Sequence, residues 1–311
     1  MKSLFSARSS VGISAAAALL VGCGGVQRAA SLLPASASYG KLRTMATVGT
    51  SGQDLLYIGL PGVSRGYIYS YPQGERIERF SEGGGWQQGA CADTSGNVYF
   101  IVLYPSGGYS LAVFQHGGTK PTDFVTRWGP TCSFDPTSGD LAVGPAGKVA
   151  IYRTVPGKPK LFSVPSNFHG IACTYDNSGN LFIDGYTSGS VPALAELRKG
   201  GTSFVSIALP KMSGHGLGAM RWDGKYLSVT NGAATIYRLA VTGKKARVAG
   251  TVQLQGLSGI SSIWIQSDTI VAGGYPLRHV FIWNYPAGGS PIKTIRNVGK
   301  GSFVAVSAPG T

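Results

Sequence analysis

The residues best suited to chemistry are two histidines and one aspartate. His169 and His215 lie in glycine-containing segments expected to open the first strands of adjacent repeats, and Asp184 ends the second strand of the repeat that contains His169. Two imidazoles and a carboxylate could bind a transition metal, or act as a base and its orienting partner. Alternatively, these histidines are hydrogen-bonded structural residues. We predict that the three contribute to ligand binding, with no catalytic residue and no bound metal.

Three aromatic residues form a second candidate site. Trp86, Trp128 and Phe168 are expected in the connections that lead from the last strand of one repeat to the first strand of the next, in three consecutive repeats. Such an arc of rings would suit stacking on a glycan or on an apolar anchor of a protein partner. The alternative is that these rings pack between neighbouring repeats.

The number and position of the carboxylates decide whether the chain could hold a divalent metal ion. The chain has 13 Asp and Glu residues, but only Asp184 and Glu82 are expected at the end of the fold where ligands would bind. Calcium and magnesium need several oxygen ligands, so two carboxylates are too few for a convincing site. The sequence also lacks a nucleophile elbow, a Walker loop, a CxxC pair and an HExxH motif. We therefore predict no cofactor.

A repeated pattern would position these residues. A strand rich in β-branched and aromatic residues runs into a glycine about every 40–45 residues, in six copies that end at Gly74, Gly117, Gly157, Gly200, Gly243 and Gly288. The first and last copies share Tyr-Pro-x-Gly. Between the copies, five polar turns separate pairs of short strands, and they begin at or contain Asp93, Asp135, Asp176, Asp223 and Asp268. Aspartate at such positions typically accepts hydrogen bonds from the turn backbone.

Each repeat thus predicts four antiparallel strands, which we call A to D from the inside outwards. A four-stranded unit of this length is a propeller blade, so the sequence predicts an all-β, six-bladed β-propeller. Seven blades or an interrupted ring are the alternatives. The first repeat lacks strand A, and an extra strand follows the last repeat at residues 302–307. We expect this strand to complete blade one and close the ring, which would leave no exposed edge there.

The phrasing D-x-x-G-N-V/L, seen from Asp93 to Val98 and from Asp176 to Leu181, resembles NHL-repeat and gluconolactonase-like propellers. The resemblance implies a propeller with its ligand site at the mouth of the central channel. It also implies a lactonase activity based on a divalent ion, which the small number of carboxylates argues against.

Three cysteines follow the N-terminal region, and each falls in a strand A. Cys91 lies two residues before its turn aspartate, whereas Cys132 and Cys173 lie three residues before theirs. Because side chains alternate along a strand, Cys91 points opposite to the other two. Cys91 and Cys132 could therefore form a disulfide between neighbouring blades in an oxidising compartment. Alternatively, all three are buried thiols.

The N-terminus has the features of an export signal. Lys2 and Arg8 precede an apolar run from Val11 to Val21 that is too short to span a bilayer. The run ends in Leu20-Val21-Gly22-Cys23, which resembles the lipobox of bacterial lipoproteins and implies acylation of Cys23. We therefore predict a signal peptide over residues 1–22, a lipidated Cys23 with a flexible tether over 23–52, and a propeller over 53–311. An ordinary secretory signal is the alternative.

The net charge of +14 comes from basic residues scattered over turns. Nucleic acid would favour a clustered basic patch, so we predict no nucleic-acid partner. The combined expectation is a monomeric lipoprotein, anchored to a bacterial membrane and facing the periplasm or the exterior. Its propeller would bind an envelope protein, peptide or glycan without catalysis. The alternatives are a propeller hydrolase or lactonase and a structural envelope protein with no small ligand.

Overall fold

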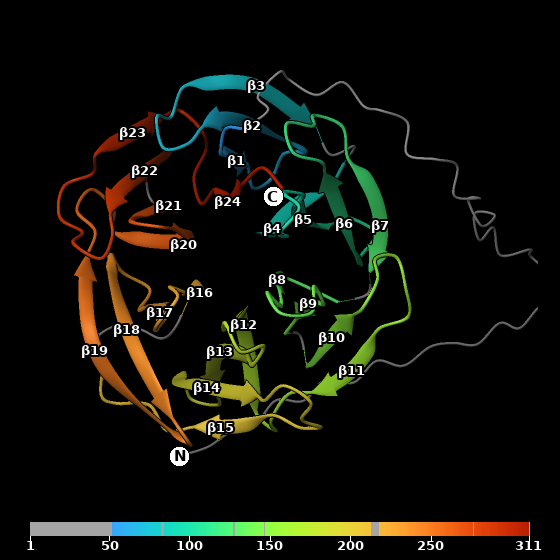
Figure 1. The fold of residues 1–311 in the computed structure, drawn as a ribbon, viewed down its shortest axis with the longest axis vertical. Coiled ribbons are helices and arrows are strands. Elements are labelled where there is room, and N and C mark those ends of the chain that lie inside the picture. Colours follow the sequence, from blue (N-terminus) through green and yellow to red (C-terminus); the bar gives the residue numbers. More distant parts are fainter. Residues whose placement is uncertain are drawn as a thin grey trace, which may run out of the picture. The chain divides into compact units, whose positions relative to one another are not determined.

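The computed structural model describes residues 52–81, 84–126, 128–145, 147–212, 218–275 and 277–310. The predicted signal peptide, Cys23, Glu82 and His215 lie outside these residues. The described residues contain no helix long and apolar enough to cross a bilayer. They form six four-stranded antiparallel sheets arranged as blades around a ring, which confirms the predicted β-propeller (Figure 1).

Each blade has its strands in the order A, B, C and D from the axis outwards. Blade one consists of β24 (Phe303–Ser307), β1 (Leu55–Gly59), β2 (Arg65–Ser70) and β3 (Arg76–Ser81). Blade two consists of β4 (Trp86–Ala92), β5 (Val98–Leu103), β6 (Tyr109–Phe114) and β7 (Thr122–Thr126). Blade three consists of β8 (Thr131–Phe134), β9 (Leu141–Gly144), β10 (Lys148–Tyr152) and β11 (Lys160–Ser163).

The second half of the ring repeats this order. Blade four consists of β12 (Phe168–Tyr175), β13 (Leu181–Thr187), β14 (Val191–Leu197) and β15 (Val205–Ile207). Blade five consists of β16 (Met220–Trp222), β17 (Leu227–Thr230), β18 (Thr235–Thr242) and β19 (Lys245–Gln253). Blade six consists of β20 (Gly259–Gln266), β21 (Thr269–Tyr275), β22 (His279–Asn284) and β23 (Lys293–Arg296).

The C-terminal strand closes the ring as predicted. β24 pairs antiparallel with β1 from Gly59↔Phe303 to Leu55↔Ser307. Val304 and Val306 are buried in the same core as β1 and β5. At the end of the strand, the Ser307 hydroxyl donates to the carbonyl of Gly96 and lies 2.7 Å from Nδ1 of His116 in blade two. The tail therefore completes blade one and also joins it to blade two.

The core lies between the blades. At the junction of blades one and two, the buried ring of Phe80 lies 4.8 Å from that of Phe114 and 5.3 Å from that of Phe100 (centroid distances). These large apolar side chains hold the sheets face to face, because burying each one contributes about 1.5–3 kcal/mol.

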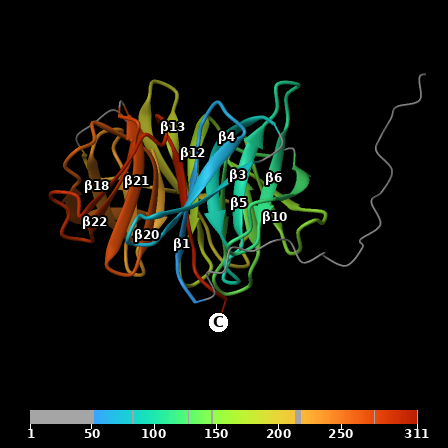
Figure 2. The ribbon, with the colours of Figure 1, turned by 90° about the horizontal axis from the view of Figure 1, so that it is seen from above.

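The four-strand order gives the ring two distinct faces. The D–A and B–C connections lie on one face, which we call the loop face. The A–B and C–D turns lie on the other, which we call the turn face. Strand A runs from the loop face to the turn face, so the C-terminus after β24 marks the turn face in the edge-on view (Figure 2).

The predicted turn aspartates are built into the turn face. Asp93 accepts hydrogen bonds from the amides of Ser95 and Asn97, both at 2.9 Å. Asp176 repeats this pattern with Ser178 and Asn180, both at 2.8 Å. Asp135 and Asp223 likewise accept hydrogen bonds from amides of their own turns, so four of the five predicted turn aspartates are confirmed in this role.

One cysteine pair is a disulfide. Cys91 in β4 and Cys132 in β8 are bonded across blades two and three, with their Cα atoms 5.7 Å apart. The alternation of side chains along strand A had left this pairing open, and the structure decides in its favour. Cys173 is a free, buried thiol.

Candidate functional site

The exposed large apolar side chains are concentrated on the loop face. Five of them belong to B–C connections or to the adjacent strand ends: Val63, Tyr186, Val191, Tyr275 and Leu277. The sixth, Trp86, begins strand A of blade two, just after a D–A connection. No exposed large apolar side chain lies in a described A–B turn. Tyr275, at the end of β21, is 52% exposed, and Trp86, at the start of β4, is 45% exposed. Exposing a large apolar side chain to water costs free energy, so the concentration of such side chains at this end of several blades makes the loop face a candidate contact surface.

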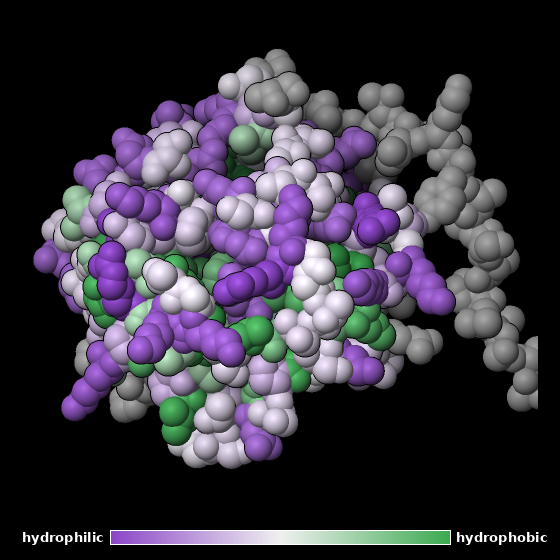
Figure 3. Space-filling view, turned by 60° about the horizontal axis from the view of Figure 1, so that its bottom comes forward, coloured by the Kyte–Doolittle hydropathy of each residue, from purple (hydrophilic) through white to green (hydrophobic). Residues whose placement is uncertain are grey.

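The outer wall of the ring differs from the loop face in how its exposed apolar side chains are distributed. Its exposed large apolar side chains are isolated: Leu161 on β11, Val248 on β19 and, at the edge next to the turn face, Ile292 in the C–D connection just before β23. Figure 3 shows separated green areas with purple polar side chains between them on the wall formed by the strands at the bottom of Figure 1.

The charge on the loop face is of one sign. Its exposed basic residues are Arg65, Lys148, Lys211, Arg278, Arg296 and Lys300. Asp184 is the only described carboxylate at this end of the blades, and its side chain is fully buried. The described loop face therefore presents basic and apolar groups with no exposed carboxylate, whereas the turn aspartates lie on the opposite face. Such a surface favours an acidic ligand.

The face is hollowed between blades three and four. A depression of about 740 Å³ is lined by Pro130, Pro145, His169 and Tyr186, together with the segment 164–168. The imidazole of His169 stacks on the ring of Tyr186, with centroids 5.2 Å apart and planes 22° from parallel. Both side chains are exposed. The predicted histidine thus takes part in an aromatic pair on the surface.

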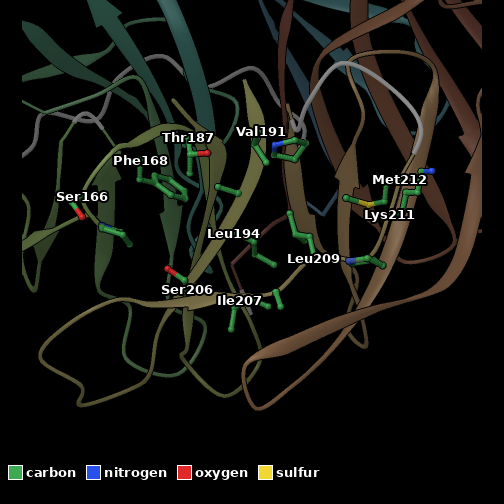
Figure 4. A pocket seen from close by; sticks show the side chains of 15 residues that line it. Ser166, Phe168, Thr187, Val191, Leu194, Ser206, Ile207, Leu209, Lys211 and Met212 are labelled. Atoms are coloured by element: carbon green, nitrogen blue, oxygen red, sulfur yellow. The ribbon is translucent and has the colours of Figure 1, made fainter. Parts of the chain in front are cut away.

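A second groove adjoins this depression along Pro165, Ser166 and Phe168. It has a volume of about 630 Å³ and lies between blade four and the segment 208–212, which leads to blade five (Figure 4). Its floor is apolar, with Leu194 and Ile207 from blade four facing Leu209 and Met212. Val191 and Lys211, both exposed, lie along its rim.

The three predicted aromatic residues have different environments. Trp86 is exposed. Trp128 is half-buried against the core of blades two and three. Phe168 is 8% exposed and belongs to the core of blade four, although its edge reaches both hollows. Of the three, only Trp86 is exposed to solvent.

Asp184 and His169 occupy different environments. The side chain of Asp184 accepts a 3.0 Å hydrogen bond from the Ala172 amide, and it does not line the depression that contains His169. Burial raises the pKa of this carboxyl well above its usual range. No group of three or more His, Cys, Asp or Glu side chains able to hold a metal occurs among the described residues. His215 lies outside them, so its predicted role stays a prediction.

Three strand boundaries differ from the sequence prediction. Trp86 and Phe168 were expected in D–A connections, but each is the first residue of a strand A, paired with Leu103 and Thr187 respectively. Asp184 was expected to end strand B, but β13 continues to Thr187. The two inner strands of blade four extend beyond their predicted ends, because β12 and β13 remain paired as far as Phe168↔Thr187, past a bulge between Gly170 and Ala172.

Sequence reasoning missed several loop-face residues. The sequence prediction of the ligand site does not include Tyr186, Val191, Tyr275 or Leu277, because each has a residue type that is ordinary for a strand or a loop. The signal that could have found them is the coincidence of apolar residues at the B–C connections of different repeats, where turn chemistry alone would favour polar types.

Neither the protein-family models nor the curated protein sequences match this chain. Several solved structures do. A chain of the crystal structure of a nidogen/laminin complex has a TM-score of 0.64 and 11% identity, over 83% of this chain and 100% of that one. A protein of unknown function from Bacteroides caccae gives 0.58 and 14%, over 82% and 99%. The β-propeller domain of Myceliophteria thermophila Cps50 (Swd1) gives 0.53 and 11%, over 81% and 88%. At these identities the likeness is one of fold, and that fold is the β-propeller.

Proposed function

We propose that this chain is a non-catalytic binding module that takes up an acidic protein or peptide on its loop face. The observation that carries the proposal is the gathering of exposed large apolar side chains there, away from the turn face. The basic residues between them would attract an acidic partner and set the rate at which it associates.

A protein or peptide fits this surface better than a glycan. Glycans stack on aromatic rings, but Val63, Val191 and Leu277 are aliphatic and offer no such platform. The 630 Å³ groove is lined mostly by aliphatic side chains and adjoins the stacked His169–Tyr186 pair. A peptide could place apolar side chains in the groove and acidic groups near Lys211.

We further propose that the module is an exported lipoprotein of the NHL-like propeller type, anchored to a bacterial membrane through Cys23. The Cys91–Cys132 disulfide supports export, because disulfides persist in oxidising compartments such as the bacterial periplasm. Labelling cells with a clickable fatty acid tests the anchor. The wild type should incorporate label and Cys23→Ser should not, whereas a labelled Cys23→Ser protein would contradict it.

Affinity capture from envelope extracts tests the binding function. The test variant is Trp86→Ser with Tyr275→Ser on the loop face. The matched control is Leu161→Ser with Ile292→Ser, which removes similarly exposed apolar side chains from the outer wall. We expect the control to retain the proteins that the wild type captures and the test variant to lose them. Retention by both variants, or capture of glycan alone, would overturn the proposal.

A further inference from the structure

A separate cavity lies on the axis of the ring. It has a volume of about 200 Å³ and is enclosed by residues of all six blades: 88–90, 130–132, 171–173, 218–221, 261–263 and Phe303. These residues come from strand A of each blade or the connection just before it, towards the loop face. The cavity is smaller than the 300–1,000 Å³ of a site for a drug-sized ligand, so only a small molecule would fit.

Arg221 is the single charged residue among those that line this cavity. Its guanidinium lies 3.5 Å from the ring centroid of Trp264 in blade six, a cation–π contact. Within the described residues it forms no ion pair, since the pairs found there join Arg198 to Glu196 and Arg238 to Asp223. Burial lowers the pKa of Arg221 to about 9, so the group still carries its charge at neutral pH.

Neither neighbouring acid forms an ion pair with Arg221 within the described residues. Burial raises the pKa of the Cys173 thiol to about 12, so this cavity residue is neutral. The carboxyl of Asp184 does not line the cavity, and burial raises its pKa as well. A half-buried cation without an anionic partner is costly, and the ring of Trp264 offsets only part of that cost.

The remaining lining suits an anion with an apolar body. Thr131 contributes a hydroxyl and Gln88 an amide. The Oγ of Ser262 accepts a 3.2 Å hydrogen bond from the Val304 amide, which leaves the hydroxyl proton of Ser262 available to donate. Ile171, Ile263 and Phe303 form apolar walls. The forked guanidinium matches a carboxylate through two parallel hydrogen bonds.

We infer that the axial cavity binds one small organic carboxylate. Its carboxylate pairs with Arg221, and its short hydrocarbon part lies against Ile171, Ile263 and Phe303. The apolar walls favour an organic acid over inorganic phosphate, which has no apolar part. This site is distinct from the loop-face surface and does not depend on it.

Calorimetric titration of the full-length protein in detergent tests this inference, with butyrate as the probe. Butyramide, of nearly the same shape without the charge, and phosphate are the comparison ligands. We expect butyrate to bind at one site and the other two to bind at least tenfold more weakly. Equal binding of butyrate and butyramide, or stronger binding of phosphate, overturns the inference, as does the absence of butyrate binding.

Variants locate the site. Arg221→Met should weaken butyrate binding about 30-fold or more, because the buried charge pair is lost. Arg221→Lys should retain part of it, because lysine keeps the charge without the fork. Arg79→Met removes an exposed charge from the outer strand β3 and should leave binding unchanged. An equal loss in Arg79→Met and Arg221→Met would show non-specific attraction and contradict the site. If Arg221→Met does not fold, Arg221→Lys and the comparison with butyramide still decide.

Discussion

The hydroxyl of Tyr285 in blade six donates a 2.6 Å hydrogen bond to the buried carboxylate of Asp223 in blade five. Asp223 also accepts a 2.7 Å hydrogen bond from Nε of Arg238 and one from the Tyr226 amide. A turn-forming aspartate thus joins two blades. Tyr71, in the other copy of Tyr-Pro-x-Gly, makes a similar link from blade one to Thr269 in blade six, at 2.7 Å.

Removing the Tyr285 hydroxyl tests this link between blades. We expect Tyr285→Phe to lower the free energy of unfolding by about 1.5–3 kcal/mol, the range for a hydrogen bond to a charged group. Urea unfolding at pH 7 measures it. A loss below about 0.5 kcal/mol would show that the contact adds little beyond Arg238.

The same cluster predicts instability in acid. Burial opposes the charge of Asp223, but hydrogen bonds from Tyr285, Tyr226 and Arg238 outweigh it and hold the pKa of Asp223 below its usual range. The carboxylate therefore contributes stability above the unfolded pKa of about 3.9. That contribution is lost as the pH falls through the lower folded pKa. Asp223→Asn should be less stable than the wild type at pH 7, with a deficit that narrows in acid. A deficit independent of pH would refute this.

Asp184 should have the opposite dependence. Because burial raises its pKa in the folded protein, the folded state binds a proton that the unfolded state releases above about pH 3.9. Its contribution therefore becomes less favourable as the pH rises from there to the folded pKa. Asp184→Asn keeps an oxygen for the Ala172 amide, and its stability relative to the wild type should increase between pH 4 and pH 8. The same difference at both pH values would contradict this.

The disulfide should contribute substantially to stability. Reduction, or the paired change Cys91→Ser with Cys132→Ser, is expected to cost about 2–4 kcal/mol. Non-reducing peptide mapping should recover the two cysteines joined and Cys173 as a free thiol. A thiol assay on unfolded protein that detects Cys91 would contradict the pairing.

The junction of blades one and two gives a packing test. Phe80→Ala should destabilise the protein by about 3–5 kcal/mol, because a fully buried ring is replaced by a cavity. Leu161→Ala on the exposed outer wall serves as the control and should change stability by less than about 0.5 kcal/mol. Similar effects of the two changes would show that Phe80 is not part of a tightly packed core.

The fold could be predicted because its signals are local and repeated. The turns at Asp93 and Asp176 fix the phase of the strands, and the odd strand at the C-terminus has an obvious place in blade one. Even the opposite directions of Cys91 and Cys132 follow from counting residues to the next turn. These features depend on backbone geometry, which the sequence specifies over a few residues.

The burial and the neighbours of the site residues depend on packing between distant parts of the chain. The spacing of residues along the sequence does not reveal that packing. The length of β13, and with it the burial of Asp184, is set by pairing with β12 across a bulge. Arg221 occurs in a recognisable strand A, but only the fold brings the ring of Trp264 beneath its guanidinium. Phe168 and Trp86 occupy equivalent positions in the repeat, yet one is buried and the other exposed.

Site-specific photo-crosslinking in living cells tests the proposed binding face most directly. A photoreactive phenylalanine analogue would replace Trp86 or Tyr275 on the loop face, Leu161 on the outer wall, or Lys225 on the turn face. We predict crosslinked protein adducts at Trp86 and Tyr275 and none at Leu161 or Lys225. Adducts at Lys225 with none at either loop-face position would contradict the account.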